Sequence, residues 1–208
     1  MEENPENNFQ ENLLKSNILG KILFSSSVIQ ERVSELGNEI TNDYINKDLL
    51  LVCVLRGGVI FLTDLIRKID LELNVDFMSI STYQGINKTS TGVVKITKDL
   101  EESIEGKDVM IVEDIIDTGL TISYLLRNLK ARYPNSIEIC TLLDRNIRRI
   151  ADINIKYVGF KIGDEYLVGY GLDYRQKYRN LKSIYEIKLD MVKKDIDSIK
   201  TTSSLFEN

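Results

Sequence analysis

The chain has 208 residues, of which 43% are hydrophobic and 28% are charged, and its formal net charge is −5. These values suit one globular domain with a sizeable buried core, and they exclude fibrous and wholly disordered proteins. The chain contains no histidine, which excludes histidine triads, most zinc sites and imidazole acid–base chemistry. Any catalytic proton transfer must therefore use another side chain, such as a carboxylate.

The N-terminal sequence, the cysteines and the charge predict a cytoplasmic protein. The first residues are acidic and polar, unlike a signal peptide, and no apolar run approaches the roughly 20 residues of a membrane span. Cys53 and Cys140 each lie in an apolar run, which is typical of buried free thiols. The negative net charge argues against broad attraction to nucleic acid. We therefore expect neither a nucleic-acid partner nor a membrane partner.

Apolar runs that alternate with helical patterns predict an α/β domain around a mainly parallel, twisted sheet flanked by helices. Ser27 and Gln30 have the spacing of a capping box before the first helical pattern. We expect helices over 29–44, 59–69 and 118–132, and strands over 49–55, 75–83, 93–97, 109–112, 137–143, 155–160, 166–168 and 183–189. The composition predicts a flexible leader over 1–17, one domain over 18–189 and a polar tail over 190–208.

The loops that follow three of the expected strands are where binding residues should lie. In parallel sheets, ligands bind at the carboxyl ends of the strands, which here means the loops after Leu55, Val112 and Leu143. The polar stretch 84–92 is bounded by glycine and is typical of a mobile loop.

The segment 112–121 carries the densest chemical signal. Glu113, Asp114 and Asp117 lie within five positions at the end of an expected buried strand. Their negative charges repel one another, and partial burial makes that repulsion unfavourable. Cations or hydroxyl donors would relieve it, although an acidic loop at a strand end can also be purely structural.

The second half of the same segment predicts a phosphate cradle. Thr118, Gly119 and Thr121 lie at the start of an expected helix, where free N–H groups and the positive end of the helix face an anion. A ligand that satisfies both halves carries hydroxyls or a metal at one end and phosphate at the other. Ribose 5-phosphate is such a ligand. A P-loop is excluded, because its glycine–lysine pattern does not occur.

This string resembles the phosphoribosyl pyrophosphate signature of the type I phosphoribosyltransferases. From about Ile18 to Ile187 the chain is similar to the hypoxanthine-guanine phosphoribosyltransferases. Besides the signature, the matching motifs are Leu55-Arg56-Gly57-Gly58, Thr82-Tyr83, Leu142-Leu143-Asp144-Arg145, Glu165-Tyr166-Leu167-Val168-Gly169-Tyr170-Gly171-Leu172-Asp173-Tyr174 and Lys177-Tyr178-Arg179-Asn180-Leu181.

The resemblance implies a type I phosphoribosyltransferase fold with a small hood formed by the terminal segments. It implies transfer of the phosphoribosyl group from phosphoribosyl pyrophosphate to a 6-oxopurine, hypoxanthine or guanine, which gives IMP or GMP and pyrophosphate in purine salvage. Mg²⁺ is the implied cofactor, and a homodimer or homotetramer is the implied assembly. The alternatives are a xanthine-preferring enzyme and a nucleotide-sensing regulator with the same fold.

The resemblance also assigns roles to individual residues. Asp117 would be the catalytic acid or base at the purine N7, and the carboxylates before it would hold the ribose hydroxyls, directly or through Mg²⁺. The residues implied in binding phosphoribosyl pyrophosphate are Arg56, Gly57, Glu113, Asp114, Asp117, Thr118, Gly119, Leu120, Thr121 and Arg179. The family often has a non-proline cis peptide in the loop at Arg56 and Gly57.

The purine and metal sites follow from the same resemblance. Tyr166 would stack on the base, and the Leu167 backbone would read its edge. The residues implied around the purine are Arg145, Tyr166, Leu167 and Asp173; those implied at the metal are Glu113, Asp114 and Asp173; and Thr82 and Tyr83 would form a lid. Arginine stands at 145 where the family usually has lysine, and threonine at 82 where serine is usual.

Several of these residues also have structural interpretations when each is taken alone. Tyr166 suits a core aromatic in a strand, Asp173 a turn cap, and Arg179 a solvated charged face. Arg56 beside two glycines suits a plain strand end. The pair at 148–149 suits either an interface or solvent. The order in which the motifs occur along the chain favours the functional interpretation.

Overall fold

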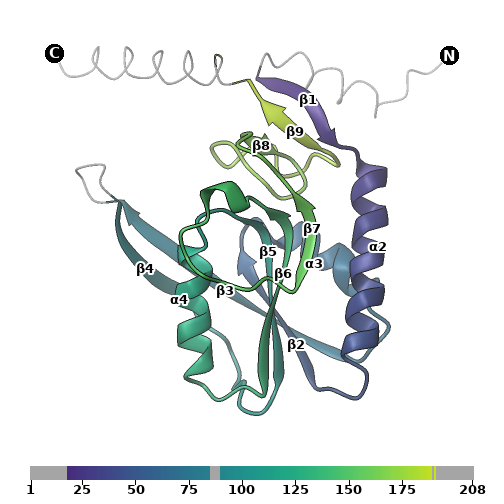
Figure 1. Cartoon of the computed structure of the whole chain (residues 1–208), viewed down its shortest axis with the longest axis vertical. Helices are drawn as coiled ribbons and strands as arrows, with labels where there is room; N and C mark the ends of the chain where they lie inside the picture. Colours follow the sequence, from purple (N-terminus) through teal and green to yellow (C-terminus); the bar gives the residue numbers. More distant parts are fainter. Residues whose placement is uncertain (1–17, 85–89, 189, 191–208) are drawn as a thin grey trace.

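The computed structural model describes residues 18–84, 90–188 and 190, which form two β-sheets (Figure 1). The larger sheet has the strand order β4-β3-β2-β5-β6-β7; all its neighbours are parallel except β3 and β4, which are antiparallel. Its strands are β2 (Leu49–Leu55), β3 (Leu73–Gln84), β4 (Ser90–Lys98), β5 (Asp108–Ile116), β6 (Ser136–Asp144) and β7 (Tyr157–Lys161). The expected mainly parallel α/β fold is confirmed.

Helices cover both faces of this sheet (Figure 1). They are α2 (Ser26–Asp43), α3 (Val59–Ile66) and α4 (Leu120–Lys130). Successive strand residues point to opposite faces, so Leu51 and Cys53 pack in one core cluster with α2 and α3. Val52 and Val54 pack in a second cluster with α4. Burial on both faces explains why β2 and residues 109–112 of β5 are continuously apolar.

The strand order creates a crevice between β2 and β5. From β2 the chain winds first outward to β3 and β4, and later through β5 toward β6 and β7. The loops after β2 and β5 therefore leave the sheet side by side at its carboxyl edge. In open α/β sheets such a reversal of winding is where ligands bind.

A small antiparallel sheet forms a hood beyond this carboxyl edge (Figure 1). It contains β1 (Leu19–Phe24), β9 (Ile184–Ile187) and β8 (Leu167–Val168) in the order β1-β9-β8. The hood has its own buried cluster, which consists of Leu19, Val168, Leu181, Tyr185 and Ile187. Tyr170 fastens the hood to the domain because its hydroxyl donates to Asp64 Oδ2 of α3 at 2.7 Å.

Besides shifted bounds, such as the end of α3 at Ile66 and not 69, the structure differs from the expected elements in the cap of α2, the start of α4 and strand β1. Ser25, not Ser27, caps α2, and its hydroxyl accepts from Val28 N at 3.4 Å. Helix α4 begins at Leu120, two residues late, because Gly119 at its N-cap has a left-handed φ of 78°. Strand β1 was not expected as a strand, and its only described pairing is with β9. The expected leader and nearly all of the expected tail lie outside the described residues.

None of the described helices is long and apolar enough to cross a bilayer.

Candidate active site

Two glycines let three backbone segments meet at the crevice between β2 and β5. A Cβ atom at Gly57 would lie 1.6 Å from Asp114 Oδ2, and one at Gly171 would lie 2.1 Å from Gly57 O. A side chain at 171 would clash with backbone, and one at 57 would displace the Asp114 carboxylate. The peptide bond between Leu55 and Arg56 is cis, as the family resemblance led us to expect. The loop after β2 therefore touches both the acidic end of β5 and the hood.

Glu113 and Asp114 place two carboxyl groups next to each other near the end of β5, one buried and one partly buried. Glu113 is 7% exposed, and burial, followed by the nearby charge of Asp114, raises its pKa well above the usual value. Burial also raises the pKa of Asp114 to about 6, although the positive charge of Arg179 opposes the shift. Both carboxylates would be stabilised by a cation or by hydroxyl donors.

A cavity of about 260 Å³ connects these carboxylates with the start of α4. Its lining includes Glu113, Asp114, Asp117, Thr118 and Thr121. At the far end the first turn of α4 offers backbone N–H groups and the positive end of the helix. The cavity thus has acceptors for hydroxyls at one end and an anion site at the other.

The loop at Thr118 and Gly119 is held from behind by the segment after β6. Ile150 N and Ala151 N donate to Thr118 O at 2.9 and 3.0 Å. Thr118 Oγ1 accepts from Leu120 N at 3.4 Å. A Cβ atom at Gly119 would lie 3.0 Å from Arg149 Cδ, so the close packing and the positive φ both favour glycine.

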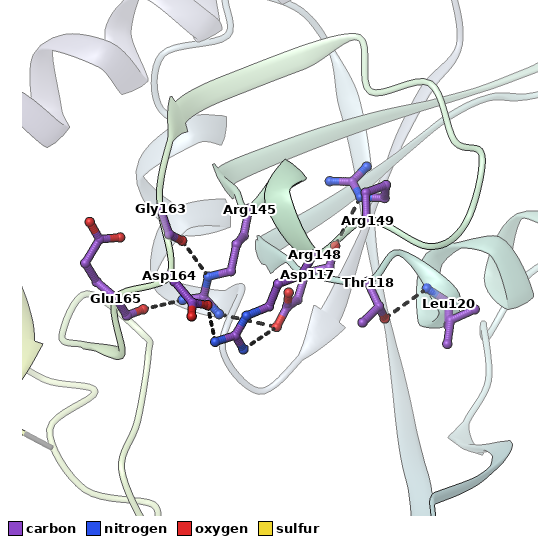
Figure 2. Close-up of polar contacts among 9 residues, drawn as sticks. All are labelled: Asp117, Thr118, Leu120, Arg145, Arg148, Arg149, Gly163, Asp164 and Glu165. Carbon is purple, nitrogen blue, oxygen red and sulfur yellow. Dashed lines mark hydrogen bonds and ion pairs between the residues drawn. The ribbon is translucent and has the colours of Figure 1, made fainter.

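Three arginines surround Asp117 (Figure 2). Arg145 Nη1 lies 3.3 Å and Arg148 Nη1 3.5 Å from Asp117 Oδ2. Arg149 Nε donates to the backbone oxygen of Asp117 at 3.0 Å. Asp117 Oδ1 is buried and has no hydrogen-bond partner among the described residues. One carboxylate oxygen is thus held in place, and the other is left able to accept a proton or a hydrogen bond.

Arg145 joins Asp117 to the loop before β8. It is 6% exposed, its Nε donates to Gly163 O at 3.0 Å, and its Nη2 donates to Glu165 O (Figure 2). The planar guanidinium makes these contacts together with the ion pair to Asp117, which one ammonium group cannot reproduce with the same geometry.

A second cavity of about 240 Å³ lies beside the first one and shares Asp114 and Ile115 with it. Arg145, Tyr166 and Leu167 also line it. Tyr166 is 49% exposed, so it is not the core aromatic that its sequence context alone suggests. The guanidinium of Arg148 lies 5.6 Å from the Tyr166 ring centroid, which leaves an aromatic face at the cavity wall.

Arg179 and Asp173 form the hood side of the site. Arg179 Nη2 lies 2.6 Å from Asp173 Oδ1, and Arg179 Nη1 donates to Gly171 O at 2.7 Å. Asp173 Oδ2 accepts from Gln176 N at 2.7 Å. Asp173 therefore does cap a turn, and Arg179 is paired and not simply solvated.

The described residues do not test the predicted lid, and they do not place three carboxylates together for a metal ion. Thr82 and Tyr83 lie in β3, but their side chains and the loop 85–89 lie outside the part that is described. Within the described residues no group of three or more histidine, cysteine or acidic side chains could hold a metal ion. Glu113, Asp114 and Asp173 thus do not form a ready-made metal cage.

The sequence analysis missed the contacts of Arg148, Arg149 and Gln176. Arg149 pairs with the buried Asp144, and Arg148 pairs with Asp164 as well as Asp117. The arginine pair is therefore not simply solvated. Its position just after β6, at the carboxyl edge of the sheet, is the signal that could have revealed these contacts.

The fold, the strand-end carboxylates and the helix-start cradle match a known domain. The family model described as "Phosphoribosyl transferase domain" matches residues 24–175. The hypoxanthine-guanine phosphoribosyltransferase of Staphylococcus aureus strain Mu50 is 51% identical over 172 residues, which cover 83% of this chain and 96% of that protein. The chain belongs to the hypoxanthine-guanine phosphoribosyltransferase family.

Solved structures agree with this assignment. A hypoxanthine phosphoribosyltransferase from Staphylococcus aureus superposes with a TM-score of 0.81 at 49% identity, covering 86% of this chain and 96% of that chain. The hypoxanthine phosphoribosyl transferase of Trypanosoma cruzi superposes with a TM-score of 0.82 at 34% identity, covering 87% and 97%.

Asp114 should make the stability of the free protein depend on pH. Its pKa rises from 3.8 to about 6 on folding, so the folded state binds more protons than the unfolded state between these values. The free energy of unfolding should therefore fall as the pH rises through this range. Asp114→Asn should remove this contribution and raise stability at pH 7 by about 1–3 kcal/mol. Urea denaturation between pH 4 and 7 measures both effects.

Glu72→Gln removes an exposed carboxylate and serves as the control, which should leave the pH dependence unchanged. A variant Asp114→Asn that is less stable than the wild type at pH 7 would contradict the assignment of Asp114 as a buried, unfavourable charge.

Proposed function

We propose that this chain transfers the 5-phosphoribosyl group from phosphoribosyl pyrophosphate to hypoxanthine or guanine. The products are IMP or GMP and pyrophosphate, and the process is purine salvage. The observation that carries this proposal is the pair of cavities that share Asp114 and Ile115 at the crevice. One suits a sugar phosphate and the other a planar base, so the bond between them forms at the shared wall. Relatives about half identical to this chain carry the corresponding enzyme name.

The first cavity would hold the ribose 5-phosphate. Glu113 and Asp114 would accept hydrogen bonds from the ribose hydroxyls. These bonds would offset the unfavourable burial of the two carboxylates, which raises the pKa of both. Thr118, Gly119, Leu120 and Thr121 would bind the 5′-phosphate through the start of α4.

The acidic residues suit Mg²⁺ that arrives with the substrate. Mg²⁺ in proteins often takes one or two carboxylates together with substrate phosphates and water, so the lack of a three-carboxylate cluster among the described residues is compatible with it. Glu113, Asp114 and Asp173 are the residues that would hold it. When bound, the ion would neutralise charge on the pyrophosphate group. Asp173 would have to loosen its pair with Arg179, which lies 2.6 Å away.

Asp117 would act at the purine N7. Its Oδ1 is buried and has no partner among the described groups, which suits an oxygen that accepts the proton of the incoming base. Arg145 and Arg148 hold the other oxygen, so the orientation of the carboxylate is set before the base binds. Positive charge that develops on the ribose during substitution would be stabilised by the neighbouring carboxylates.

The second cavity would hold the base. Tyr166 would stack on the purine, and the Leu167 backbone would read its edge. Arg145 lines the same cavity, and a cation there suits a 6-oxo group as acceptor better than the exocyclic amine of adenine. On the side of the site opposite the base, pyrophosphate would be bound by Arg179 and by the backbone of Arg56 and Gly57. Thr82 and Tyr83 would close over the reacting centre as a lid.

Assembly and compartment are further parts of the proposal. Ile147 and Ile150 next to the site are 62% and 70% exposed, which supports a homodimer or homotetramer that covers them; light scattering after gel filtration would reveal the mass. Two buried free cysteines support a reducing compartment such as the cytoplasm.

A direct assay tests the function. Incubation with phosphoribosyl pyrophosphate, Mg²⁺ and one base at a time should yield nucleotide and pyrophosphate with hypoxanthine and with guanine. Product with xanthine alone would favour the xanthine-preferring alternative. Nucleotide binding without turnover for any base would indicate a regulator and would contradict the proposal.

Asp117→Asn should slow turnover by about 10²–10⁴-fold with little change in the affinity for phosphoribosyl pyrophosphate. The amide keeps an oxygen that can face Arg145 and Arg148, but it cannot take the proton at N7. Steady-state kinetics and direct titration of the substrate separate the two effects. Asp152→Asn, at an exposed position, is the control. A turnover equal to that of the wild type would remove the acid–base role.

Arg145→Lys should change the preference among hypoxanthine, guanine and xanthine. Lysine keeps the charge but loses the planar guanidinium that binds Gly163 O and Glu165 O. The loop 163–166 before β8 is then held less firmly. We expect the Michaelis constants for the bases to rise by about tenfold, and by unequal factors. Competition between pairs of bases measures the preference. Unchanged ratios would show that Arg145 does not govern base recognition.

A further inference from the structure

Gln176 holds two arginines that approach it from opposite sides of the site. Arg56 Nη1 donates to Gln176 Oε1 at 3.1 Å, and Arg179 Nη2 donates to the same oxygen at 3.0 Å. The backbone of Gln176 is fixed as well, because its N–H donates to Asp173 Oδ2 at 2.7 Å. Arg56 follows β2, whereas Arg179 belongs to the hood segment. One amide oxygen thus joins two separate parts of the chain.

Gln176 is an uncharged acceptor, so it leaves the positive charges of the two arginines in place. Two guanidinium groups that share one oxygen repel each other, and a carboxylate would remove that repulsion by cancelling charge. Gln176 orients both groups with hydrogen bonds but cancels neither charge. Asp173 Oδ1 pairs with Arg179 at 2.6 Å, so the two arginines and this aspartate together retain one net positive charge. Such an arrangement is preorganised for an anion with several charged oxygens.

The position of Arg56 and Arg179 indicates which anion they bind. Arg179 also donates to Gly171 O at 2.7 Å, and Gly171 packs against Gly57 O. Gly57 in turn touches Asp114, which lines both cavities. The charge of Arg179 acts on Asp114 at the wall that the two cavities share, and Gln176 holds the Arg56 guanidinium next to that of Arg179.

We propose that Gln176 is a positioning residue for the pyrophosphate group of the substrate and product. It sets the spacing of the Arg56 and Arg179 side chains and leaves their charges available to the phosphates. The inference rests on the proposed function, in which only the backbone of Arg56 and Gly57 contacts pyrophosphate. It gives the Arg56 side chain a contact with pyrophosphate as well.

Gln176→Glu separates charge from geometry, because the side chain keeps its shape and its acceptor while it gains a negative charge. We expect the dissociation constant of pyrophosphate with Mg²⁺, measured by calorimetry, to rise about tenfold. Its dependence on salt should weaken, because one cation is neutralised. In turnover assays the Michaelis constant for phosphoribosyl pyrophosphate should rise by a similar factor, while kcat should change by less than about threefold.

Gln176→Ala and IMP provide the controls. The alanine variant keeps both charges but loses the shared acceptor, so pyrophosphate affinity should fall only about threefold and retain its salt dependence. IMP lacks the pyrophosphate group, so its affinity should be unchanged in both variants. Asn38→Asp adds the same charge at an exposed position on α2 and should have no effect.

Two results would overturn the inference: unchanged pyrophosphate affinity in Gln176→Glu, or an equal loss of IMP and pyrophosphate affinity, which would indicate general distortion. A wild-type protein that binds neither ligand would instead overturn the proposed function, and the inference with it.

Discussion

Burial of negative charge at the end of β5 is the constraint on which the rest of the site depends. Glu113 and Asp114 lie near the carboxyl end of a central strand of the sheet, where Glu113 is buried and Asp114 is partly buried, and burial raises the pKa of both. Glycine at 57 leaves room for the Asp114 carboxylate, which a larger residue would displace. The free protein therefore maintains an arrangement that is unfavourable for stability and suited to a ligand with hydroxyls or a bound cation, a common compromise at functional sites.

The cationic side of the site is built mainly from arginine. Asp117 and Asp144 are contacted by arginines from the segment after β6, and Asp173 by Arg179. A guanidinium can bind a carboxylate and a backbone carbonyl at once, and Arg145 does so with Asp117 and Gly163. These contacts fix side chains and loop backbones together. The resulting charge pattern places acidic groups in the wall of the first cavity and arginines next to Asp117 and Asp173.

The sequence was most informative where function depends on a continuous segment. The strand end, acidic turn and helix start over 112–121 were predictable because the residues that form them are consecutive in the sequence. Strand β1 was not, because its described pairing is with β9, at the far end of the domain. The contact of Arg148, at the end of η1 (Asn146–Arg148), with Asp117 spans 31 residues. Local patterns contain no information on such long-range geometry.

Under the proposed function, Arg145 links base recognition to proton transfer. Arg145 binds the carbonyl groups before Tyr166 and also Oδ2 of Asp117. A shift of the loop 163–166 would therefore move the Asp117 carboxylate through Arg145. Oδ1 of that carboxylate is buried without a partner among the described residues. Under the proposed function, a base that fits poorly against this loop would also find Asp117 misplaced for its N7. Selectivity would then act on the chemical step as well as on binding, because one buried side chain controls both.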